Sequence, residues 1–512
     1  MSGFAVVFNN RDRVELDKMI HKIKHRGPHF SGKYEYKRII MAQNYLRGDI
    51  NGGIDDISQE CRIQVPAFLS ASPELKICYD GQMGNWKERA EPVDVSDGPF
   101  REERLLLRLY HEYGPRMLDY LDDSIFAFVI SDGEDLFAAR DLLGIKPLFY
   151  GWENGTLYLA SELKSLTAVT DDVYEFSPGH YMDNQGRFTR FAELPKTPPE
   201  VLHTNLDKML EDIRSIIKRS LRSRVDFSVP TAGLLSGGMD SSVINFLAND
   251  FYKETFGNDA RLKTFTLGVG ESDDIRNARL LADHINSDHH ELIVDLNEIL
   301  SVLSEVIYYL ESFDPSLVRS SVSNYLISKY ASNQGIDLLL SGEGGDEIFC
   351  GYIYLKDFPV EELFSRQMEC IGFLHNNASL RLDRMNNCNS VRVVAPLISG
   401  ELFRYVLAVT SEYKQKQEGD QKIEKWIFRK AFEQYLPEAI TKRVKQEFSQ
   451  GSGSADVLPS YFEKAVDTKE FKSARVDYPM IRSKEEFYYF QIFTKHFGRG
   501  RAVDTVGQWI SL

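Results

Sequence analysis

The chain has 512 residues, 43% of them hydrophobic and 27% charged, which is the composition of an ordinary globular protein of about two to four domains. Its formal net charge of −15 argues against nucleic acid or an anionic membrane as the main partner. Five scattered cysteines without a Cys-x-x-Cys pair indicate neither a disulfide framework nor a zinc site. No apolar run approaches the roughly 20 residues that cross a bilayer. Because the N-terminus also lacks a signal-peptide pattern, a reduced cytoplasmic enzyme is expected.

Residues 1–192 are predicted to form one β-rich domain. Short apolar runs lie at 4–8, 124–130, 135–139 and 157–160, and helical spacing appears at 15–24 and 104–113. Asp-Gly at 132–133 and Asn-Gly at 154–155 are turn signals between such runs. Three prolines between residues 195 and 199 resist both helix and sheet. Segment 193–205 is therefore predicted to be a linker.

Residues 206–512 are predicted to form a second domain in which strands and helices alternate. The predicted strands are 229–235, 262–269, 291–294 and 336–340, and the predicted helices are 242–251, 275–285, 296–311 and 321–333. This alternation implies a parallel sheet, whose ligands bind at the carboxyl ends of the strands. Glycine-rich polar segments follow the first and last of these strands. One shared site is therefore expected at that edge of the sheet.

The segment 236–241, Ser-Gly-Gly-Met-Asp-Ser, is the most informative motif in the chain. Its glycines let the backbone approach a polyanion, and the N–H groups of the following helix face it, with Ser236 and Ser241 as further donors. Asp240 would repel phosphates unless a divalent cation lay between them. The loop also lacks the Lys-Ser/Thr ending of a P-loop. The motif therefore predicts nucleotide phosphates held with Mg²⁺, and it argues against ordinary γ-phosphate transfer.

This loop resembles the pyrophosphate-binding loop of ATP pyrophosphatase enzymes, and the rest of the chain resembles the asparagine synthetase family. The further motifs are Ser-Gly-Glu-Gly-Gly-Asp-Glu at 341–347 with Gly-Tyr at 351–352, Lys-Gln-Glu-Phe-Ser-Gln-Gly at 445–451, Arg-Asp-Leu-Leu-Gly-Ile-Lys-Pro-Leu at 140–148 and Ala-Ser-Glu-Leu-Lys-Ser-Leu at 160–166. They stand in family order over essentially the whole chain. The resemblance implies an N-terminal αββα sandwich of the N-terminal-nucleophile type, followed by a parallel-sheet ATP-pyrophosphatase domain.

The resemblance also implies ATP and Mg²⁺ as cofactors. Asp240 and Asp346 are expected to hold the metal, although capping of a helix is the ordinary alternative for both. Lys445 is expected to neutralise charge on pyrophosphate and the acyl-adenylate, and Glu343 to accept a proton from the attacking nitrogen. The expected nucleotide contacts are Leu235, Ser236, Gly237, Gly238, Asp240, Ser241, Leu267, Gly342 and Gly344. The candidate contacts to substrate or phosphate are Arg319, Arg381 and Arg384.

The N-terminal domain resembles a glutaminase in which a cysteine follows the initiator methionine, but that position holds Ser2. A hydroxyl is a far poorer nucleophile than a thiol unless a base activates it. Other elements of the glutamine pocket differ as well. The family's arginine is replaced at or near Tyr45, its Asn-Gly-Glu is Asp-Gly-Gln at 80–82, its Gly-Ser-Asp is lost around 100–102, and the aspartate after Arg-Gly-Pro is His29. The domain is therefore expected to be degenerate and unable to hydrolyse glutamine.

Two further departures concern the substrate. Arg392, Val394 and Ser399 stand where the family has a glutamate, an arginine and an aspartate near the synthetase cleft, so the acid or the amine is expected to be an unusual one. Glu343 stands where β-lactam synthetases have a tyrosine, which favours attack by a separate amine. The tail at 497–501, followed by Asp504, nevertheless resembles the tails of those synthetases.

The sequence thus predicts an ATP-dependent carbon–nitrogen ligase that forms AMP and pyrophosphate. It would couple a small-molecule carboxylate to ammonia or a small amine. The alternative is ring closure within one substrate, as in β-lactam synthetases, for a specialised metabolite such as an antibiotic. A relic without activity is disfavoured because Asp240, Glu343, Asp346 and Lys445 all persist. A homodimer is suggested by the resemblance alone.

Overall fold

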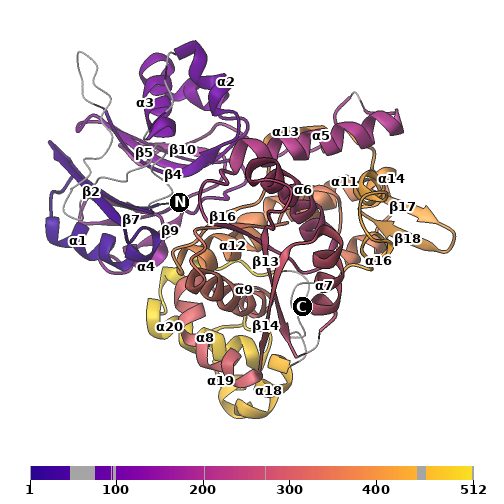
Figure 1. The fold of residues 1–512 in the computed structure, drawn as a ribbon. Helices are drawn as coiled ribbons and strands as arrows, with labels where there is room; N and C mark the ends of the chain where they lie inside the picture. The colour runs from indigo at the N-terminus through magenta and orange to yellow at the C-terminus, as the bar shows by residue number, and fades with distance from the viewer. Residues whose placement is uncertain are drawn as a thin grey trace. The chain divides into compact units, whose positions relative to one another are not determined.

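The computed structural model describes residues 2–46, 75–93, 95, 98, 100–200, 202–270, 272–446 and 457–509. The chain divides into two compact units (Figure 1). The first unit consists of Met1–Leu194 with Phe497–Thr505, and the second of Pro195–His496 with Val506–Leu512. Within the described ranges, every helix is too short or too polar to cross a membrane.

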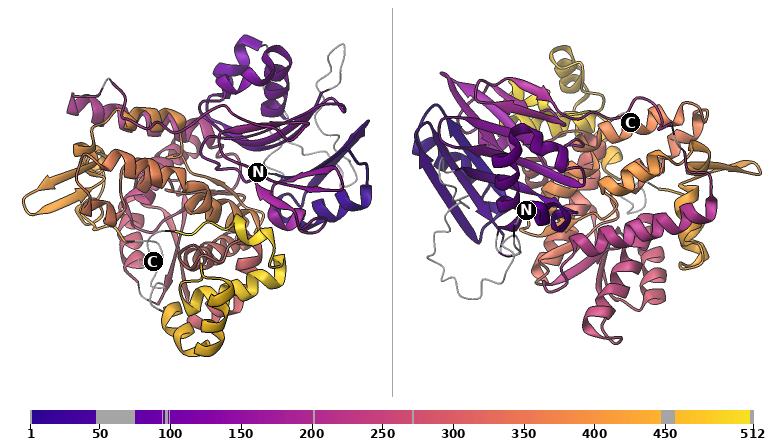
Figure 2. Two further views of the ribbon diagram at one scale, coloured as in Figure 1. Left: turned by 180° about the vertical axis from the view of Figure 1, so that it is seen from behind. Right: turned by 90° about the horizontal axis from the view of Figure 1, so that it is seen from above.

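The first unit contains two antiparallel sheets (Figure 2). One has the strand order β2 (Phe30–Tyr36), β3 (Ile39–Tyr45), β1 (Gly3–Phe8), β8 (Thr156–Ala160), β7 (Phe149–Glu153) and β9 (Val173–Glu175). The other has the order β11 (Phe188–Arg190), β10 (His180–Asp183), β6 (Leu136–Arg140), β5 (Ser124–Ser131) and β4 (Lys76–Met83). The helical segments are α1 (Arg13–Lys22), η1 (Lys24–Arg26), α2 (Trp86–Ala90), η3 (Glu91–Val93), α3 (Arg101–Tyr113), η4 (Gly114–Tyr120), α4 (Leu163–Leu166) and η7 (Arg501–Thr505).

Side chains alternate between the two faces of a strand, and this alternation identifies the layers of the first unit. Along β5, Phe126 and Phe128 point into a core shared with α3, while Ala127 and Val129 point into a core shared with the other sheet. The helices α1 and α4 contact strands of that other sheet, and α3 contacts β4. The layers are therefore helix, sheet, sheet and helix, which confirms the predicted αββα sandwich.

The Asn-Gly turn signal of this unit is confirmed. Asn154 and Gly155 have φ angles of 49° and 80°, and Glu153 pairs with Thr156 across them. A two-residue hairpin needs this positive-φ backbone, which Asn and Gly adopt at low cost.

The second unit is built on five parallel strands, which confirms the predicted sheet. Their order is β14 (Asp288–Val294), β13 (Lys263–Val269), β12 (Thr231–Leu234), β15 (Leu338–Leu340) and β16 (Arg392–Val394). The chain runs outward from β12 to β14 and then returns to the other side of β12. The strand order thus reverses between β12 and β15, and the carboxyl ends of strands at such a reversal form a ligand-binding crevice.

Helices connect and surround these strands (Figure 1). The helical segments are α5 (Leu206–Arg224), α6 (Met239–Phe256), α7 (Asp273–Ile285), α8 (Leu296–Leu310), α9 (Pro315–Asn333), α10 (Gly345–Ile348), η5 (Ile353–Asp357), α11 (Leu363–Gly372), η6 (Leu374–Asn376), α12 (Ala378–Asn387), α13 (Gly400–Leu407), α14 (Ser411–Lys414), α15 (Trp426–Phe432), α16 (Glu438–Thr441), α18 (Val457–Ala465), α19 (Thr468–Asp477) and α20 (Lys484–Phe497). A hairpin of β17 (Gln415–Glu418) and β18 (Gln421–Glu424) precedes α15.

The start of α6 is packed tightly against β12. Asn245 of α6 donates hydrogen bonds to the carbonyls of Leu234 and Ser241, both at 2.8 Å. A Cβ atom at Gly233 would lie 1.6 Å from Asn245 Oδ1. The strand and the helix can therefore approach closely enough to shape the intervening loop only with glycine at this position.

We predict that Gly233→Ala destabilises the second unit by about 1–3 kcal/mol, because Asn245 must move and give up its hydrogen bonds. Thermal unfolding of the full chain measures the effect. Gly500→Ala is the matched control, since a Cβ atom there meets nothing within 4 Å. Equal stability of the two variants would contradict the proposed close packing.

Candidate active site

The loop after β12 is shaped for an anion. Ser236 and Ser241 contact each other through their hydroxyls at 3.1 Å, and Gly238 N donates to Ser236 Oγ at 3.4 Å. Gly237 has a φ angle of 66°, and a Cβ atom there would lie 2.4 Å from the backbone of Asn277. The helix α6 begins at once without a side-chain cap. Its first N–H groups and positive dipole end are thus available to a phosphate.

Two carboxylates from separate strand ends converge beside this loop. Asp240 lies in the first turn of α6, and Asp346 lies in α10, which follows β15. Lys425 Nζ pairs with Asp240 Oδ2 and lies 2.7 Å from Asp346 Oδ1. Lys445 Nζ lies 2.6 Å from Asp346 Oδ2. We call these four residues the ion cluster.

Within the ion cluster, burial and neighbouring charges shift the pKa values of Asp346, Asp240 and Lys445. Burial raises the pKa of Asp346, but Lys425 and Lys445 outweigh this effect and hold that pKa below its usual range. Burial keeps the pKa of Asp240 above its usual value despite Lys425. Burial lowers the pKa of Lys445, but Asp346 and Asp240 raise it above the ordinary lysine value. Both lysines are therefore held beside anionic oxygen atoms.

The donor set fits Mg²⁺. Carboxylate oxygens are the ligands that this metal prefers, usually together with phosphate oxygens and water. Asp240 Oδ1 is buried and accepts no hydrogen bond from the described residues. It points toward Gly345, where a Cβ atom would lie 2.3 Å away. A second glycine, Gly342, packs directly on the backbone of Ser241. The two loops are thus close enough to present both carboxylates to one ion.

The ion cluster lies in a pocket that opens to solvent. Twelve of the predicted site residues line it, namely Leu235, Ser236, Gly238, Asp240, Ser241, Leu267, Gly342, Glu343, Gly344, Asp346, Arg381 and Lys445. They come from loops after β12 and β15, from β13, from α12 and from the segment before residue 447. Tertiary structure thus brings together residues that are more than 200 positions apart. Residues 447–451 of the third motif lie outside the described residues.

Three predicted site residues lie elsewhere. Arg319 is bound by both carboxylate oxygens of Glu485, at 2.9 and 2.6 Å, and Arg384 is buried with Glu311 at 2.7 Å. Gly237 does not line the pocket. It packs on Asn277, and its positive φ angle forms the turn of the loop. Each guanidinium thus neutralises a carboxylate within the fold, and contact of Arg319 and Arg384 with substrate or phosphate stays a prediction.

Sequence reasoning missed several pocket residues, of which Lys425 is the most important. It has a left-handed backbone, with φ of 52°, at the start of α15. Strained backbone of this kind often occurs at functional positions. Lys425 stands in an ordinary Glu-Lys-Trp sequence, where a lysine is usually solvated, so the local sequence carried no signal. Other pocket residues to which the sequence assigned no site role include Asp274, Asn324, Glu347, Tyr352, Arg429, Arg443 and Gln446, of which Glu347, Tyr352 and Gln446 stand in the quoted motifs.

Two of these missed residues anchor the segment that carries Lys445. Arg443 donates to the carbonyl of Ser236 at 3.0 Å and to Asp274 at 2.7 Å. Arg429 donates to Glu424 Oε1 at 2.5 Å, and the same oxygen accepts the backbone N–H of Lys445 at 3.1 Å. The lysine segment is therefore fastened both to the phosphate loop and to the start of α15.

The pocket wall away from the phosphate loop carries a second set of polar groups. Glu343 forms an ion pair with Arg381 of α12, and Tyr352 donates its hydroxyl proton to buried Glu347 at 2.7 Å. Arg392, Val394 and Ser399, which mark the departure from the family motif, do not line the pocket. Ser399 instead caps α13 by accepting the N–H of Leu402 at 3.3 Å. The wall is thus formed by α12 and the loop after β15.

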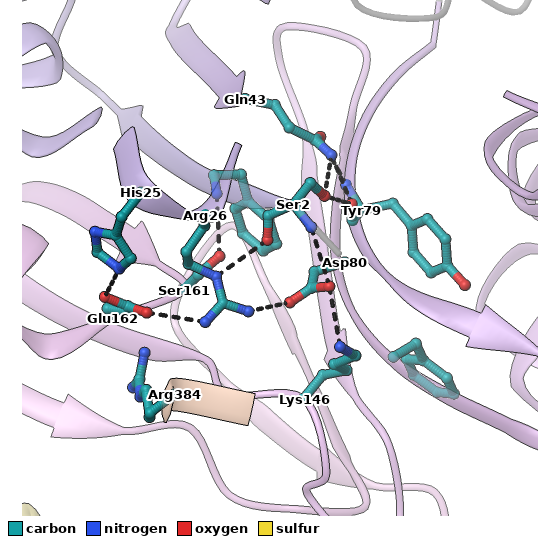
Figure 3. Close-up of polar contacts among 12 residues, drawn as sticks. Ser2, His25, Arg26, Gln43, Tyr79, Asp80, Lys146, Ser161, Glu162 and Arg384 are labelled. Carbon is teal, nitrogen blue, oxygen red and sulfur yellow. Dashed lines mark hydrogen bonds and ion pairs between the residues drawn. The ribbon is translucent and has the colours of Figure 1, made fainter. Parts of the chain in front are cut away.

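The predicted glutaminase pocket lies within the first unit (Figure 3). Ser2 Oγ donates to the carbonyl of Tyr79 at 2.6 Å and accepts from Gln43 Nε2 at 2.6 Å. The backbone N–H of Ser2 donates to Asp80 Oδ1 at 3.4 Å. Asp80 also binds Arg26 at 2.7 Å and Lys146 at 3.3 Å. Ser2 is therefore a buried member of a hydrogen-bonded ionic network.

Aromatic side chains engage several positions at which the sequence departs from the glutamine-pocket pattern. The ring of Tyr79 lies over Gly81, where a Cβ atom would be 2.4 Å from it, and Tyr79 donates to Glu102 at 2.6 Å. Tyr45 is buried, with its ring centroid 5.6 Å from that of Phe100. The positions at which the glutamine pocket departs from its family pattern are thus engaged with one another.

The tail that resembles β-lactam synthetases lies in the first unit, although the synthetase pocket lies in the second. Arg501 pairs with Asp172 at 2.9 Å and stacks over the ring of Tyr174. Because the tail does not line this pocket, the tail motif does not support the ring-closure alternative.

Comparisons with known proteins agree with the two units. Residues 212–371 and 358–505 match the model of the asparagine synthase family, and residues 1–217 match that of the glutamine amidotransferase domain. The chain is 30% identical to asparagine synthetase [glutamine-hydrolyzing] 3 of Arabidopsis thaliana, covering 96% of this chain and 86% of that one. It is 31% identical to asparagine synthetase B [glutamine-hydrolyzing] of Escherichia coli, covering 99% and 93%.

Fold and site together define an adenine-nucleotide-dependent ligase of the ATP-pyrophosphatase type. The chain belongs to the asparagine synthetase family. The predicted class of enzyme, an ATP-dependent carbon–nitrogen ligase that forms AMP and pyrophosphate, is thereby confirmed.

Glu103 is buried beside Tyr45, and this burial predicts that the stability of the first unit depends on pH. Burial raises the pKa of Glu103 from 4.5 to about 8, so the folded chain retains a proton that the unfolded chain releases. Stability therefore falls as the pH rises from about 4.5 to about 8. We predict that Glu103→Gln, which cannot ionise, gains several kcal/mol of stability relative to wild type between about pH 5 and pH 8.5.

The measurement is thermal unfolding of both proteins across that pH range. Glu112→Gln, at the exposed end of α3, is the matched control and should follow the wild-type profile. The explanation fails if the Glu103→Gln profile also parallels that of the wild type.

Proposed function

We propose that this chain activates a carboxylate with ATP and couples it to ammonia or a small amine without hydrolysing glutamine. The ion cluster carries the proposal, because Asp240, Asp346, Lys425 and Lys445 meet where the strand order reverses. Cationic and metal-binding groups are needed there to stabilise the charge that develops as pyrophosphate leaves. The names of the relatives, asparagine synthetases, support amide formation as the overall reaction.

Each group in the pocket has a task in the first step. Mg²⁺, held by Asp240 and Asp346, would screen the phosphates that leave as pyrophosphate. The N–H groups at the start of α6 and the hydroxyls of Ser236 and Ser241 would bind the same phosphates. Lys445 and Lys425 would supply the remaining positive charge. The carboxylate oxygen that attacks the α-phosphorus would then become part of an acyl-adenylate.

Glu343 would act in the second step. A nitrogen that attacks the acyl carbon must lose a proton, and the carboxylate of Glu343 lines the pocket as a possible acceptor. Arg381 pairs with that carboxylate and fixes its position. Collapse of the tetrahedral species releases AMP and leaves the amide.

Three features of the first unit support the absence of glutamine hydrolysis. The partners of Ser2 Oγ are an amide nitrogen and a peptide carbonyl, and neither takes up a proton at neutral pH. Removal of Met1 would make the Ser2 nitrogen an amine, which Asp80 would hold in its protonated form. Tyr45 and Phe100, which stand at or near positions where the family binds glutamine, pack against each other instead, with ring centroids 5.6 Å apart.

We predict that Asp240→Ala and Lys445→Ala each abolish exchange of label between pyrophosphate and ATP. The loss should reach at least about 100-fold, because each variant removes a charged group from the position where charge develops. The assay is run with a panel of carboxylic acids and Mg²⁺, and the released nucleotide is identified. Lys430→Ala on the exposed face of α15 is the control. Formation of ADP, or full exchange in either variant, would refute the assignment.

We also predict that glutamine is not a nitrogen donor. Wild type and Ser2→Ala should turn over ammonia or a small amine equally, and neither should release glutamate from glutamine. Chromatography of the amino acids after incubation with each donor measures both quantities. Glutamate production that depends on Ser2 would show an active serine nucleophile and overturn this part of the proposal.

A further inference from the structure

The ammonium of Lys425 contacts carboxylate oxygens of Asp240 and Asp346 that are candidate ligands for a metal shared by the two aspartates. It pairs with Asp240 Oδ2 and lies 2.7 Å from Asp346 Oδ1, so it connects one oxygen of each carboxylate. The Lys425 side chain is 2% exposed and both aspartate side chains are 15% exposed. Lys445 contacts the other oxygen of Asp346. The two positive and two negative charges of the ion cluster therefore balance.

The fold is built to bring Lys425 to this position. A Cβ atom at Gly351 would lie 1.9 Å from Lys425 Cε and 2.2 Å from Asp346 Oδ1, so only glycine leaves room for the lysine. The left-handed backbone at Lys425 directs its side chain away from the path of α15. The preceding residue, Glu424, is fixed by Lys356 and Arg429, each at 2.5 Å. The contact is thus supported from both ends of the side chain.

This arrangement has an energetic consequence for metal binding. On Asp346 a divalent ion must replace Lys425 at Oδ1 or Lys445 at Oδ2. On Asp240 it can use Oδ1, which accepts no hydrogen bond from the described residues, but it then neutralises the carboxylate with which Lys425 pairs. A free ion would leave a buried ammonium without a counter-charge, which is costly in a protein interior. A metal that arrives with pyrophosphate also brings anionic oxygens, to which Lys425 and Lys445 can transfer their contacts. The cost is then offset.

We propose that Lys425 is a built-in counter-ion that excludes free divalent metal and admits it only together with a polyphosphate. This inference rests on the proposed function of the pocket. Lys425 competes with the metal for Asp240 and Asp346, and it becomes a phosphate ligand once the metal–polyphosphate complex has entered. Metal and nucleotide therefore bind together, and the metal does not occupy the site before the nucleotide binds.

Lys445 provides an internal comparison. It contacts one carboxylate only among the ion-cluster aspartates, and its side chain is 23% exposed. Water can solvate this ammonium when its partner is taken, so its competition with the metal is weaker. Loss of Lys425 should therefore release the metal site more fully than loss of Lys445.

The test measures binding to the full chain by titration calorimetry and thermal shift, with MgCl₂ alone, pyrophosphate alone and both together. Wild type should be stabilised by Mg²⁺ with pyrophosphate and not by Mg²⁺ alone. Lys425→Met should bind Mg²⁺ alone, and its affinity for Mg²⁺ with pyrophosphate should fall about 10- to 100-fold. Lys445→Met should show a smaller gain for Mg²⁺ alone. Lys430→Met should behave as wild type.

The outcomes separate the two proposals. If wild type binds Mg²⁺ with pyrophosphate, and also binds Mg²⁺ alone in a manner lost in Asp240→Asn, the counter-ion role is refuted while the proposed function stands. The counter-ion role is equally refuted if folded Lys425→Met behaves as wild type. If wild type binds neither pyrophosphate nor ATP with Mg²⁺, the proposed function itself fails. The wild-type measurement decides the matter even if Lys425→Met does not fold.

Discussion

The pairing of Asp240 and Asp346 with Lys425 is the interaction on which the proposed chemistry of the second unit depends. Two carboxylates that contact the same ammonium repel each other strongly in a poorly solvated pocket. The arrangement persists because Lys425 lies between them and Lys445 lies beside Asp346. The same charges are those that a metal-bound polyphosphate needs. Under the proposed function, the same side chains meet the electrostatic requirement of a stable fold and that of the reaction.

Sheet topology explains why these residues meet at all. The strands β12 and β15 are neighbours although more than 100 residues separate them, since the chain first runs outward through β13 and β14. Each strand ends in a glycine-rich loop, and Gly342 and Gly345 allow the second loop to rest on the first. A side chain at either glycine would force the loops apart. Close approach of backbone to backbone therefore sets the separation of the two aspartates.

The first unit has the αββα architecture although several residues of the predicted glutamine pocket differ from the family pattern. Arg26, Asp80 and Lys146 form a buried network around Ser2, and every charge has an opposite neighbour (Figure 3). Tyr45 packs against Phe100, and the ring of Tyr79 lies over Gly81. Such a network rigidifies a core only when all its members are satisfied.

The sequence by itself predicted a parallel sheet, four of its five strands and the two phosphate-type motifs, because periodicity and glycine turns are local properties of the chain. The αββα class followed from the family resemblance, and the apolar runs of the first unit predicted only β1, β5, β6 and β8 among its described strands. The sequence did not reveal the strand β16, which is three residues long, or the polar start of β14, whose Asp-His-His-Glu lacks the apolar pattern of a strand. Lys425, Arg443 and the partners of Arg319 and Arg384 were decided only by the tertiary structure. A charged side chain acquires its role from the opposite charge that it meets, and such partners stand from about 70 to about 200 residues away in the chain.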